Sequence, residues 1–115
     1  MQTKTFLAAA MALPAFTEAA SCVYRADGSA ILRRYKINAD GVDDVPGICG
    51  GLWDNMNGQG ACHGAIPGWC NDNGGGKLEW VFDIGVACNS GAVEAVWWEA
   101  TKNRFGDIHC SFGPI

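Results

Sequence analysis

The six cysteines constrain this chain more than any other feature, and all of them lie beyond residue 20. They are Cys22, Cys49, Cys62, Cys70, Cys88 and Cys110. In a small exported chain an even number of cysteines indicates a disulfide framework, and six cysteines allow fifteen connectivities. Zinc sites use closer pairs than Cys62 and Cys70, which have seven residues between them, and no C-x-x-C motif occurs. We therefore expect three structural disulfides and neither a metal site nor a cofactor.

The expectation of an oxidising compartment comes from residues 1–19, which have the pattern of a signal peptide. Lys4 supplies the positive charge, and residues 6–16 form an apolar run interrupted only by a proline. Thr17 and Ala19 are small residues at the positions that signal peptidase requires, and cleavage one residue later is the close alternative. A membrane anchor needs about 20 apolar residues, which this run lacks. We therefore expect a cleaved signal peptide at residues 1–19.

The remainder, residues 20–115, has the length of a single disulfide-stabilised domain with a small core. The whole chain has a formal net charge of −4, which removal of the signal peptide leaves unchanged because Lys4 and Glu18 cancel. Nucleic acids and anionic membranes attract clustered basic residues. The only basic cluster lies at residues 33–36, in an expected strand, where a dibasic processing site is the alternative. We expect a secreted monomer with no nucleic-acid or membrane partner.

The first half of this domain predicts a β-hairpin followed by a helix. Residues 22–26 and 29–37 are the expected strands, and Asp27-Gly28 between them is a favoured two-residue turn. Residues 45–57 predict a helix near a proline, with apolar residues three and four apart. A weak strand is expected at residues 65–70.

The second half predicts a strand at residues 77–88 and a helix at residues 91–104. Apolar and polar side chains alternate along the strand, so that one face is apolar. The apolar face consists of Leu78, Trp80, Phe82, Ile84 and Val86. Asn89 or Ser90 caps the helix, basic side chains lie near its C-terminal end, and Gly106 ends it. Its expected buried stripe consists of Val93, Val96, Trp97 and Ala100.

The order of these elements predicts the fold. A last short strand is expected at residues 107–112. Counted from the second strand of the hairpin, the elements are then strand, helix, strand, strand, helix and strand. This is the β-α-β-β-α-β order of a ferredoxin-like sandwich, in which two helices cover one face of an antiparallel sheet. We therefore expect an α+β fold, a small disulfide-rich two-layer sandwich in which disulfides join helix to sheet.

No catalytic motif is present in the sequence. His63 and His109 could serve as base and acid in RNA cleavage, but each is also simply the neighbour of a structural cysteine. The G-x-S-x-G motif of hydrolases does not occur. The acidic residues that a glycosidase would need fit the polar faces of the expected strand and helix. These residues are Glu79, Asp83, Glu94 and Glu99. We expect no enzyme activity, with a ribonuclease or other hydrolase as an alternative.

Five tryptophans are many for so short a domain. Trp80 and Trp97 fall on faces assigned to the core, where large aromatic side chains add buried area. Trp53, Trp69 and Trp98 lie near loops or beside the buried stripe, and exposed tryptophans often form sugar-binding or protein-binding surfaces. Packing into the core is the equal alternative for these three. We take them as the candidate binding surface.

Residues 49–110 carry a resemblance to known proteins, above all in two stretches. The stretches are WCNDNGGGKLEWVFDIGVACNSG and WWEATKNRFGDIHC. Together with the signal peptide and six cysteines, they resemble the small cysteine-rich secreted effectors of plant-pathogenic filamentous fungi, including the biotrophy-associated secreted proteins. The layout is also similar to necrosis-inducing effector domains and killer-toxin-like sandwiches, although the cysteine spacing departs from that of the killer toxins. No functional residue carries over.

The resemblance implies a virulence-related protein that acts outside the fungal cell or inside the host. Its expected role is to bind a host protein or glycan in the host apoplast or at the biotrophic interface, with the host cytoplasm as a further destination. A secreted antimicrobial or killer-type toxin is the second hypothesis, although the acidic charge does not suit a cationic, membrane-active toxin. An extracellular ribonuclease or other hydrolase is the third.

Overall fold

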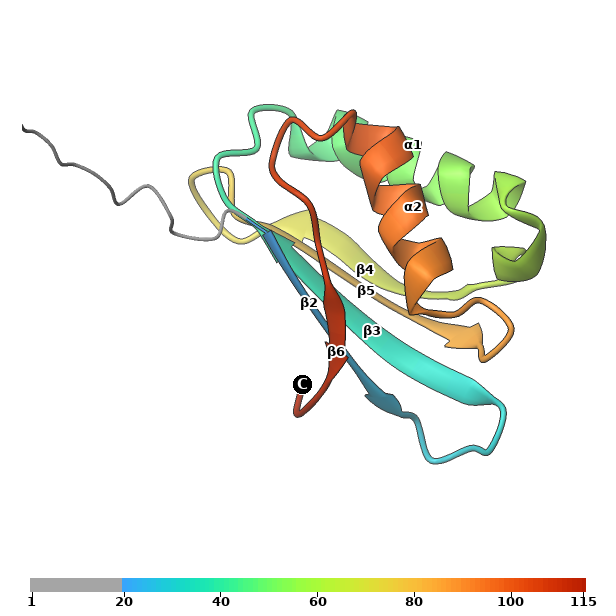
Figure 1. Ribbon diagram of the computed structural model, residues 1–115. Helices are drawn as coiled ribbons and strands as arrows, with labels where there is room; N and C mark the ends of the chain where they lie inside the picture. The colour runs from blue at the N-terminus through green and yellow to red at the C-terminus, as the bar shows by residue number, and fades with distance from the viewer. Residues whose placement is uncertain (1–19) are drawn as a thin grey trace, which may run out of the picture.

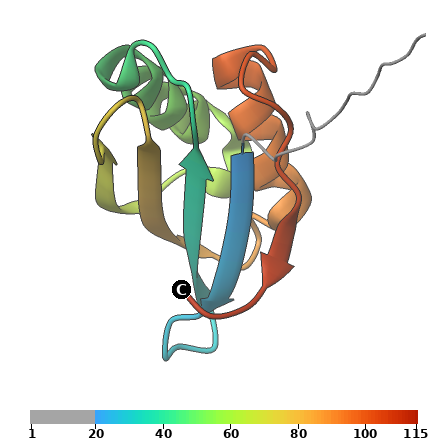
Figure 2. The ribbon, with the colours of Figure 1, turned by 90° about the vertical axis from the view of Figure 1, so that its left-hand side faces the viewer.

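The computed structural model describes residues 20–115, which form a five-stranded sheet with two helices against one face (Figure 1). Among these residues no helix covers the other face, which is turned toward the viewer in Figure 2. The strands are β2 (Ala20–Ala26), β3 (Leu32–Ala39), β4 (Ile66–Asp72), β5 (Leu78–Gly85) and β6 (Cys110–Phe112). The helices are α1 (Val45–Gly58), the short 3-10 helix η2 (Gly60–Cys62) and α2 (Ser90–Thr101). The predicted α+β class and two layers are confirmed, whereas the signal peptide expected at residues 1–19 lies outside the described residues.

The strand order of the sheet is β4-β5-β3-β2-β6, and it departs from the prediction at one edge. β2 pairs with β3, β3 with β5, and β4 with β5, each time antiparallel. β6 instead pairs with β2 in parallel, with Cys22 opposite Cys110. The predicted all-antiparallel sheet is therefore wrong at this edge, and the ferredoxin-like order is not confirmed. The reason is that the hairpin places β2 against β3, so that β6 reaches only the outer side of β2.

The connection between β2 and β3 is longer than the sequence predicts. Residues 27–31 separate the two strands, in place of a two-residue turn at Asp27-Gly28. The Ile31 N–H donates to the Ser29 hydroxyl oxygen at 3.2 Å, and Gly28 has a φ of 85°, which glycine adopts without strain. Ile31 is exposed instead of lying in the strand, and its carbonyl oxygen accepts a hydrogen bond from the Val86 N–H at 3.0 Å.

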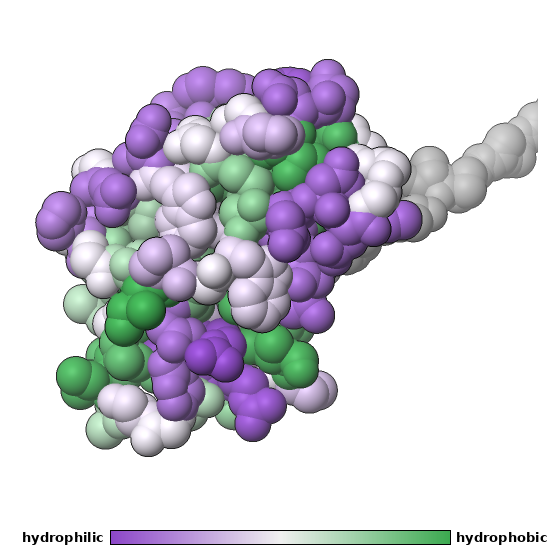
Figure 3. All heavy atoms as spheres, turned by 180° about the vertical axis from the view of Figure 1, so that it is seen from behind, coloured by the Kyte–Doolittle hydropathy of each residue, from purple (hydrophilic) through white to green (hydrophobic). Residues whose placement is uncertain are grey.

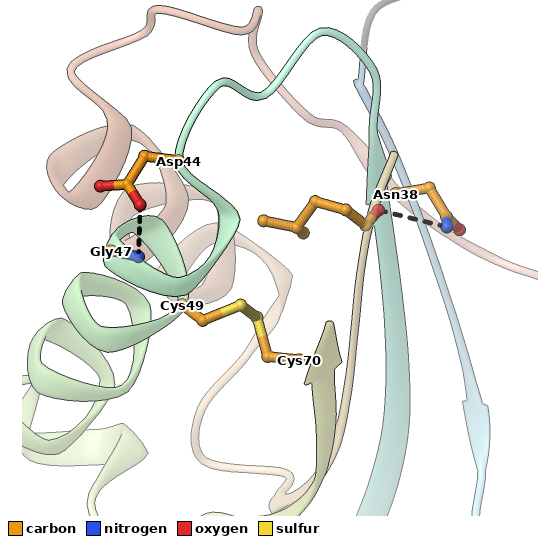
Figure 4. The surroundings of a disulfide bond; sticks show 6 residues. Asn38, Asp44, Gly47, Cys49 and Cys70 are labelled. Carbon is orange, nitrogen blue, oxygen red and sulfur yellow. Dashed lines mark hydrogen bonds between the residues drawn. A yellow bond between two sulfur atoms is a disulfide. The ribbon is translucent and has the colours of Figure 1, made fainter. Parts of the chain in front are cut away.

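Helix α1 begins where the sequence predicts. The Asp44 carboxylate accepts a hydrogen bond from the Gly47 N–H at 3.2 Å, and the proline lies in the first turn (Figure 4). Its buried residues are Val45, Ile48, Cys49, Leu52 and Met56. This apolar side packs against the sheet, as the three-and-four spacing predicts.

Helix α2 has the predicted start but an earlier end. The Asn89 side chain accepts a hydrogen bond from the Ala92 N–H at 3.0 Å, which confirms it as the cap. The helix ends at Thr101, where Lys102 takes a left-handed conformation with a φ of 52°, and not at Arg104. The basic side chains expected in the last turn therefore follow the helix. No helix within residues 20–115 is long and apolar enough to cross a membrane.

The core lies between the helices and the side of the sheet that faces them. Leu78, Trp80, Phe82 and Ile84 of β5 are all buried. This confirms the predicted alternation, although Val86 lies beyond the end of the strand and is exposed. Trp97 on α2 is fully buried, and its Nε1 donates to the Gly106 carbonyl oxygen at 2.8 Å. The prediction that Trp80 and Trp97 belong to the core is confirmed.

All six cysteines form disulfides, as predicted, and the fold selects one of the fifteen connectivities. The pairs are Cys22–Cys110, Cys49–Cys70 and Cys62–Cys88. The first pair joins β2 to β6, the second joins α1 to β4 (Figure 4), and the third joins η2 to the segment before α2. All six cysteines lie in or against the core on the helix side of the sheet. One disulfide therefore joins a helix to the sheet, as predicted, and the other two join the first strand to the last strand and η2 to the segment before α2.

Candidate functional site

The three tryptophans of the predicted binding surface lie in different places. Trp53 on α1 is half-buried and packs edge-on against the buried Trp80, with ring centres 5.4 Å apart. Trp98 on α2 is 47% exposed, and the Lys102 ammonium nitrogen lies 5.8 Å from its ring centre. Trp69 on β4 is 49% exposed. Trp53 therefore serves the core, and Trp69 and Trp98 belong to different layers, so the three do not form one surface.

A β-bulge at Gly68 decides which way Trp69 points. The register runs from the Pro67–Phe82 pair directly to the Trp69–Val81 pair, which leaves Gly68 without a partner in β5. Because side chains alternate along a strand, this extra residue shifts Trp69 to the face without helices. A Cβ atom on residue 68 would lie 2.7 Å from the Val81 carbonyl oxygen, so only glycine fits the bulge.

The neighbouring Cys70 points the opposite way. Its disulfide to Cys49 of α1 holds the Cys70 side chain on the helix side of the sheet, as Figure 4 shows. Trp69 is therefore displayed on the face of the sheet that no helix covers within residues 20–115, which we call the open face. Its side chains from the three strands β3, β4 and β5 include Arg34, Lys36, Asn38, Ile66, Trp69, Asn71, Glu79, Val81 and Asp83.

Glu79 holds the indole of Trp69 in one orientation. Trp69 Nε1 donates to Glu79 Oε2 at 2.7 Å, and Asn73 Nδ2 donates to Glu79 Oε1 at 3.2 Å. The Lys36 ammonium lies 3.9 Å from the same Oε1. These interactions, the hydrogen bond from Trp69 first, lower the pKa of Glu79 below its usual range. The indole is thus anchored through its N–H while half of its surface stays exposed.

Arg34 and Asp83 form a second fixed group on the open face. Arg34 Nε donates to Asp83 Oδ1 at 2.8 Å, and Nη2 donates to Oδ2 at 3.2 Å, so the pair is bidentate. The guanidinium lowers the pKa of Asp83 and the carboxylate raises the pKa of Arg34. The carboxyl group of Asp27, in the loop of the hairpin, hydrogen-bonds to Asp83, which raises the pKa of Asp27.

A small hollow of about 150 Å³ lies between these groups, and we call it the Trp69 hollow. Its lining residues are Arg34, Ile66, Pro67, Gly68, Trp69, Val81, Phe82 and Asp83. One side of the hollow is thus aromatic and apolar, and the other side carries the Arg34–Asp83 pair. Val81, the cross-strand neighbour of Trp69, is only 4% exposed although it lies on the open face. The hollow therefore combines a fixed aromatic ring with fixed polar groups.

Trp98 lies beside a wider hollow of about 340 Å³, which is also lined by Glu94, Asp107 and His109. Glu94 Oε2 accepts a hydrogen bond from the Cys110 N–H at 2.8 Å, so this carboxylate already serves the backbone of β6. Within residues 20–115 the Trp98 indole N–H has no hydrogen-bond partner. The ring of Trp98 thus lacks the anchor that Glu79 provides for Trp69.

The two histidines considered for RNA cleavage have different surroundings. His63 Nδ1 lies 3.3 Å from the Asn57 carbonyl oxygen, beyond η2. His109 lines the hollow beside Trp98, and His63 is not part of that lining. In the described part of the chain, no group of three or more His, Cys, Asp or Glu side chains is placed to hold a metal ion.

The sequence identified Trp69 as a candidate but not the groups that fix it. The alternation along β5 places Glu79 and Asp83 on its polar face, without naming their partners. Those partners, Trp69 and Arg34, come from other strands, 10 and 49 residues away in the chain. The Pro67-Gly68 dipeptide is the one local signal, since proline and glycine within a strand often mark a bulge.

The chain was compared with protein-family models, with curated proteins and with solved structures, and none of the three comparisons found a match.

Proposed function

We propose that this protein is a secreted, non-enzymatic effector of a filamentous plant pathogen, and that it binds a host protein or glycan through the open face of its sheet. The proposal combines the resemblance of residues 49–110 with the disulfide framework, which suits an oxidising extracellular environment. It needs no catalytic group and no cofactor.

One observation carries the choice of binding surface: Trp69 is half exposed, yet its indole N–H is held by Glu79 at 2.7 Å. A side chain that is ordered before its ligand arrives loses less conformational entropy on binding. Tryptophan and arginine are also the residues most often found at the energetic centre of binding surfaces. Trp69 and Arg34 line the same hollow.

The test compares Trp69→Ala with Trp98→Ala in the full chain, secreted from yeast so that the disulfides form. The two tryptophans are similarly exposed, at 49% and 47%, but they lie on different layers of the fold. We expect the unaltered protein and the Trp98 variant to be retained on host cell-wall and apoplast material, and the Trp69 variant to be lost on washing. Equal retention of the two variants would contradict the assignment of the open face.

The role in virulence is tested separately, by transcript timing and by host colonisation after deletion of the gene. We expect expression to rise during growth in living host tissue. Constant expression in culture and in the host, with unchanged colonisation, would contradict the effector proposal. Inhibition of competing microbes at low micromolar protein would favour the toxin instead.

A further inference from the structure

The Trp69 hollow has the size of one six-membered ring. Its volume is about 150 Å³. A cavity of about 150 Å³ in another protein is known to hold a benzene molecule, which sets the scale. The hollow is too small to accommodate the side of a helix. The indole of Trp69 forms part of its wall and is exposed to solvent. A ligand that fills it therefore inserts one ring-sized group and lies flat against the indole.

The lining of the hollow combines apolar and polar groups within the width of a single ring. Trp69, Ile66 and Pro67 offer apolar surface. On the other side, Arg34 binds Asp83 through Nε and Nη2, so that both hydrogens of Nη1 remain available to donate within the described residues. A sugar ring matches this pattern, because its C–H face is apolar and its hydroxyl groups both donate and accept hydrogen bonds.

The charged side chains of β3 and β5 on the open face are already paired. Arg34 is paired with Asp83, and Lys36 lies 3.9 Å from Glu79. The chain as a whole has a net charge of −4, which repels polyanions. An ionic ligand would have to separate these pairs, whereas a neutral ligand leaves them intact.

The surroundings of Trp69 do not have the composition of a protein-docking surface. The centre of such an interface is apolar and depleted of charged residues. Here the apolar neighbours are Val81 and Ile66, and four charged side chains lie around them on the same face, namely Arg34, Lys36, Glu79 and Asp83. Seen from behind, hydrophilic and hydrophobic residues are interspersed, and the hydrophobic ones occur in separate groups (Figure 3).

We propose that the Trp69 hollow binds a neutral glycan, with one sugar ring stacked on the indole of Trp69 and its hydroxyl groups facing Arg34 and Asp83. The proposal narrows the proposed function from a host protein or glycan to an uncharged polysaccharide, and it rests on that function. The bulge at Gly68 and the hydrogen bond to Glu79 are what prepare the ring for this contact.

The experiment titrates the secreted protein with hexasaccharides and follows binding by calorimetry and by the indole N–H signal of Trp69 in nuclear magnetic resonance spectra. The neutral probes are the hexamers of glucose, xylose, mannose and N-acetylglucosamine in β-linkage, and the anionic probe is hexagalacturonate. We expect at least one neutral probe to bind and to shift the Trp69 signal, with hexagalacturonate at least tenfold weaker.

Variants separate stacking from general effects of substitution. We expect Trp69→Ala to weaken binding of the neutral probe at least tenfold, and Trp98→Ala to change it less than twofold. Trp69→Phe keeps an aromatic ring but loses the bond to Glu79, so an intermediate loss is expected. It also serves as the informative variant if Trp69→Ala fails to fold.

Three results would overturn the proposal. The first is undiminished binding of the neutral probe by both Trp69 variants, and the second is tighter binding of hexagalacturonate than of every neutral probe. The third is no binding of any probe while a purified host protein binds in a Trp69-dependent way. In this last case the proposed function stands and only the glycan is wrong, whereas absence of any host-derived ligand together with unchanged colonisation removes both.

Discussion

The two faces of the sheet use the same strands for different purposes. On the helix side, β5 presents Trp80 and Phe82, which are fully buried, and the disulfides lie in or against this core. On the open face, the same strand presents Glu79 and Asp83, which bind side chains from neighbouring strands. The difference teaches that stability is concentrated on one face, which leaves the other face free to carry a site.

Tryptophan shows the contrast most directly. Trp80 and Trp69 lie on adjacent strands, one register position apart, yet one is fully buried and the other is half exposed. Trp80 Nε1 is buried without a hydrogen-bond partner within residues 20–115, whereas Trp69 Nε1 is bound by a carboxylate. On the helix side, packing thus outweighs the cost of one unpaired indole N–H, whereas the indole N–H on the open face is paired.

The largest effect is expected from the disulfide that closes the longest loop. Cys22–Cys110 spans 88 residues and Cys49–Cys70 spans 21. The chain-entropy relation gives about 4.6 kcal/mol for the first and about 3.3 kcal/mol for the second. Replacing both cysteines of a pair with alanine should therefore lower the free energy of unfolding more for the first pair, as measured in urea. A larger loss for the second pair would show that helix docking dominates over loop closure.

The next effect compares the two faces through their tryptophans. Trp80→Ala removes a fully buried side chain and should cost about 3–5 kcal/mol of unfolding free energy. Trp69→Ala removes a half-exposed ring and one hydrogen bond, so we expect a cost of about 1 kcal/mol. Thermal and urea unfolding of the two variants measures the difference. Similar costs would refute the view that the helix side holds the fold.

A smaller effect is expected at the bulge. Gly68→Ala places a Cβ atom 2.7 Å from the Val81 carbonyl oxygen, and relief of that clash should cost about 1–3 kcal/mol. It should also displace Trp69 from Glu79, because Trp69 directly follows the bulge and a shift of the backbone at residue 68 moves its indole. The indole N–H chemical shift of Trp69 reports this displacement. Gly113→Ala, at a position with open space around it, is the matched control and should leave the shift unchanged.

The smallest effect is a loss of stability at acid pH, which arises from carboxyl groups on the open face. The hydrogen bond from Trp69 lowers the pKa of Glu79, and the bonds from Arg34 lower the pKa of Asp83. A lowered pKa in the folded state stabilises the fold above the unfolded pKa, and this stability is lost as the pH falls through the folded value. Asp27, whose pKa is raised, acts in the opposite direction, since its contribution is lost as the pH rises.

We therefore expect the free energy of unfolding to fall as the pH drops below about 4.5, the ordinary pKa of a glutamate, and through the lowered values at which Glu79 and Asp83 take up protons in the folded protein. Urea unfolding at several pH values in this range measures the slope. Glu79→Gln should make the dependence of the unfolding free energy on pH shallower, because the glutamine side chain does not titrate. An unchanged slope in this variant would show that the Glu79 carboxylate does not contribute.

Much of the fold follows from local patterns. The alternation of β5, the cap at Asn89 and the proline near the start of α1 all depend on residues within a few positions of one another, and each prediction is confirmed. The prediction was wrong where distant segments compete for the same partner. β2 takes the place beside β3, so β6 joins the sheet at its outer edge, where it runs parallel to β2.

The candidate site was predictable in part. The composition pointed to Trp53, Trp69 and Trp98 together, and only the fold separates them into a core neighbour and two exposed rings on different layers. Glu79 and Arg34 could not be assigned to the site from the sequence, because cross-strand contacts depend on register. A single bulge residue changes that register and reverses the direction of every side chain that follows it.

The sequence by itself determined that six cysteines would be paired, that one face of β5 would be apolar, and that two helices would cover a sheet. These are consequences of residue type and spacing along the chain. Only the tertiary structure decided which cysteines meet, which edge β6 joins, and that Trp69 faces outward. The physical reason is that these outcomes depend on which distant segments come together. Chain entropy, strand register and packing act together to determine these contacts, so they cannot be read from single residues.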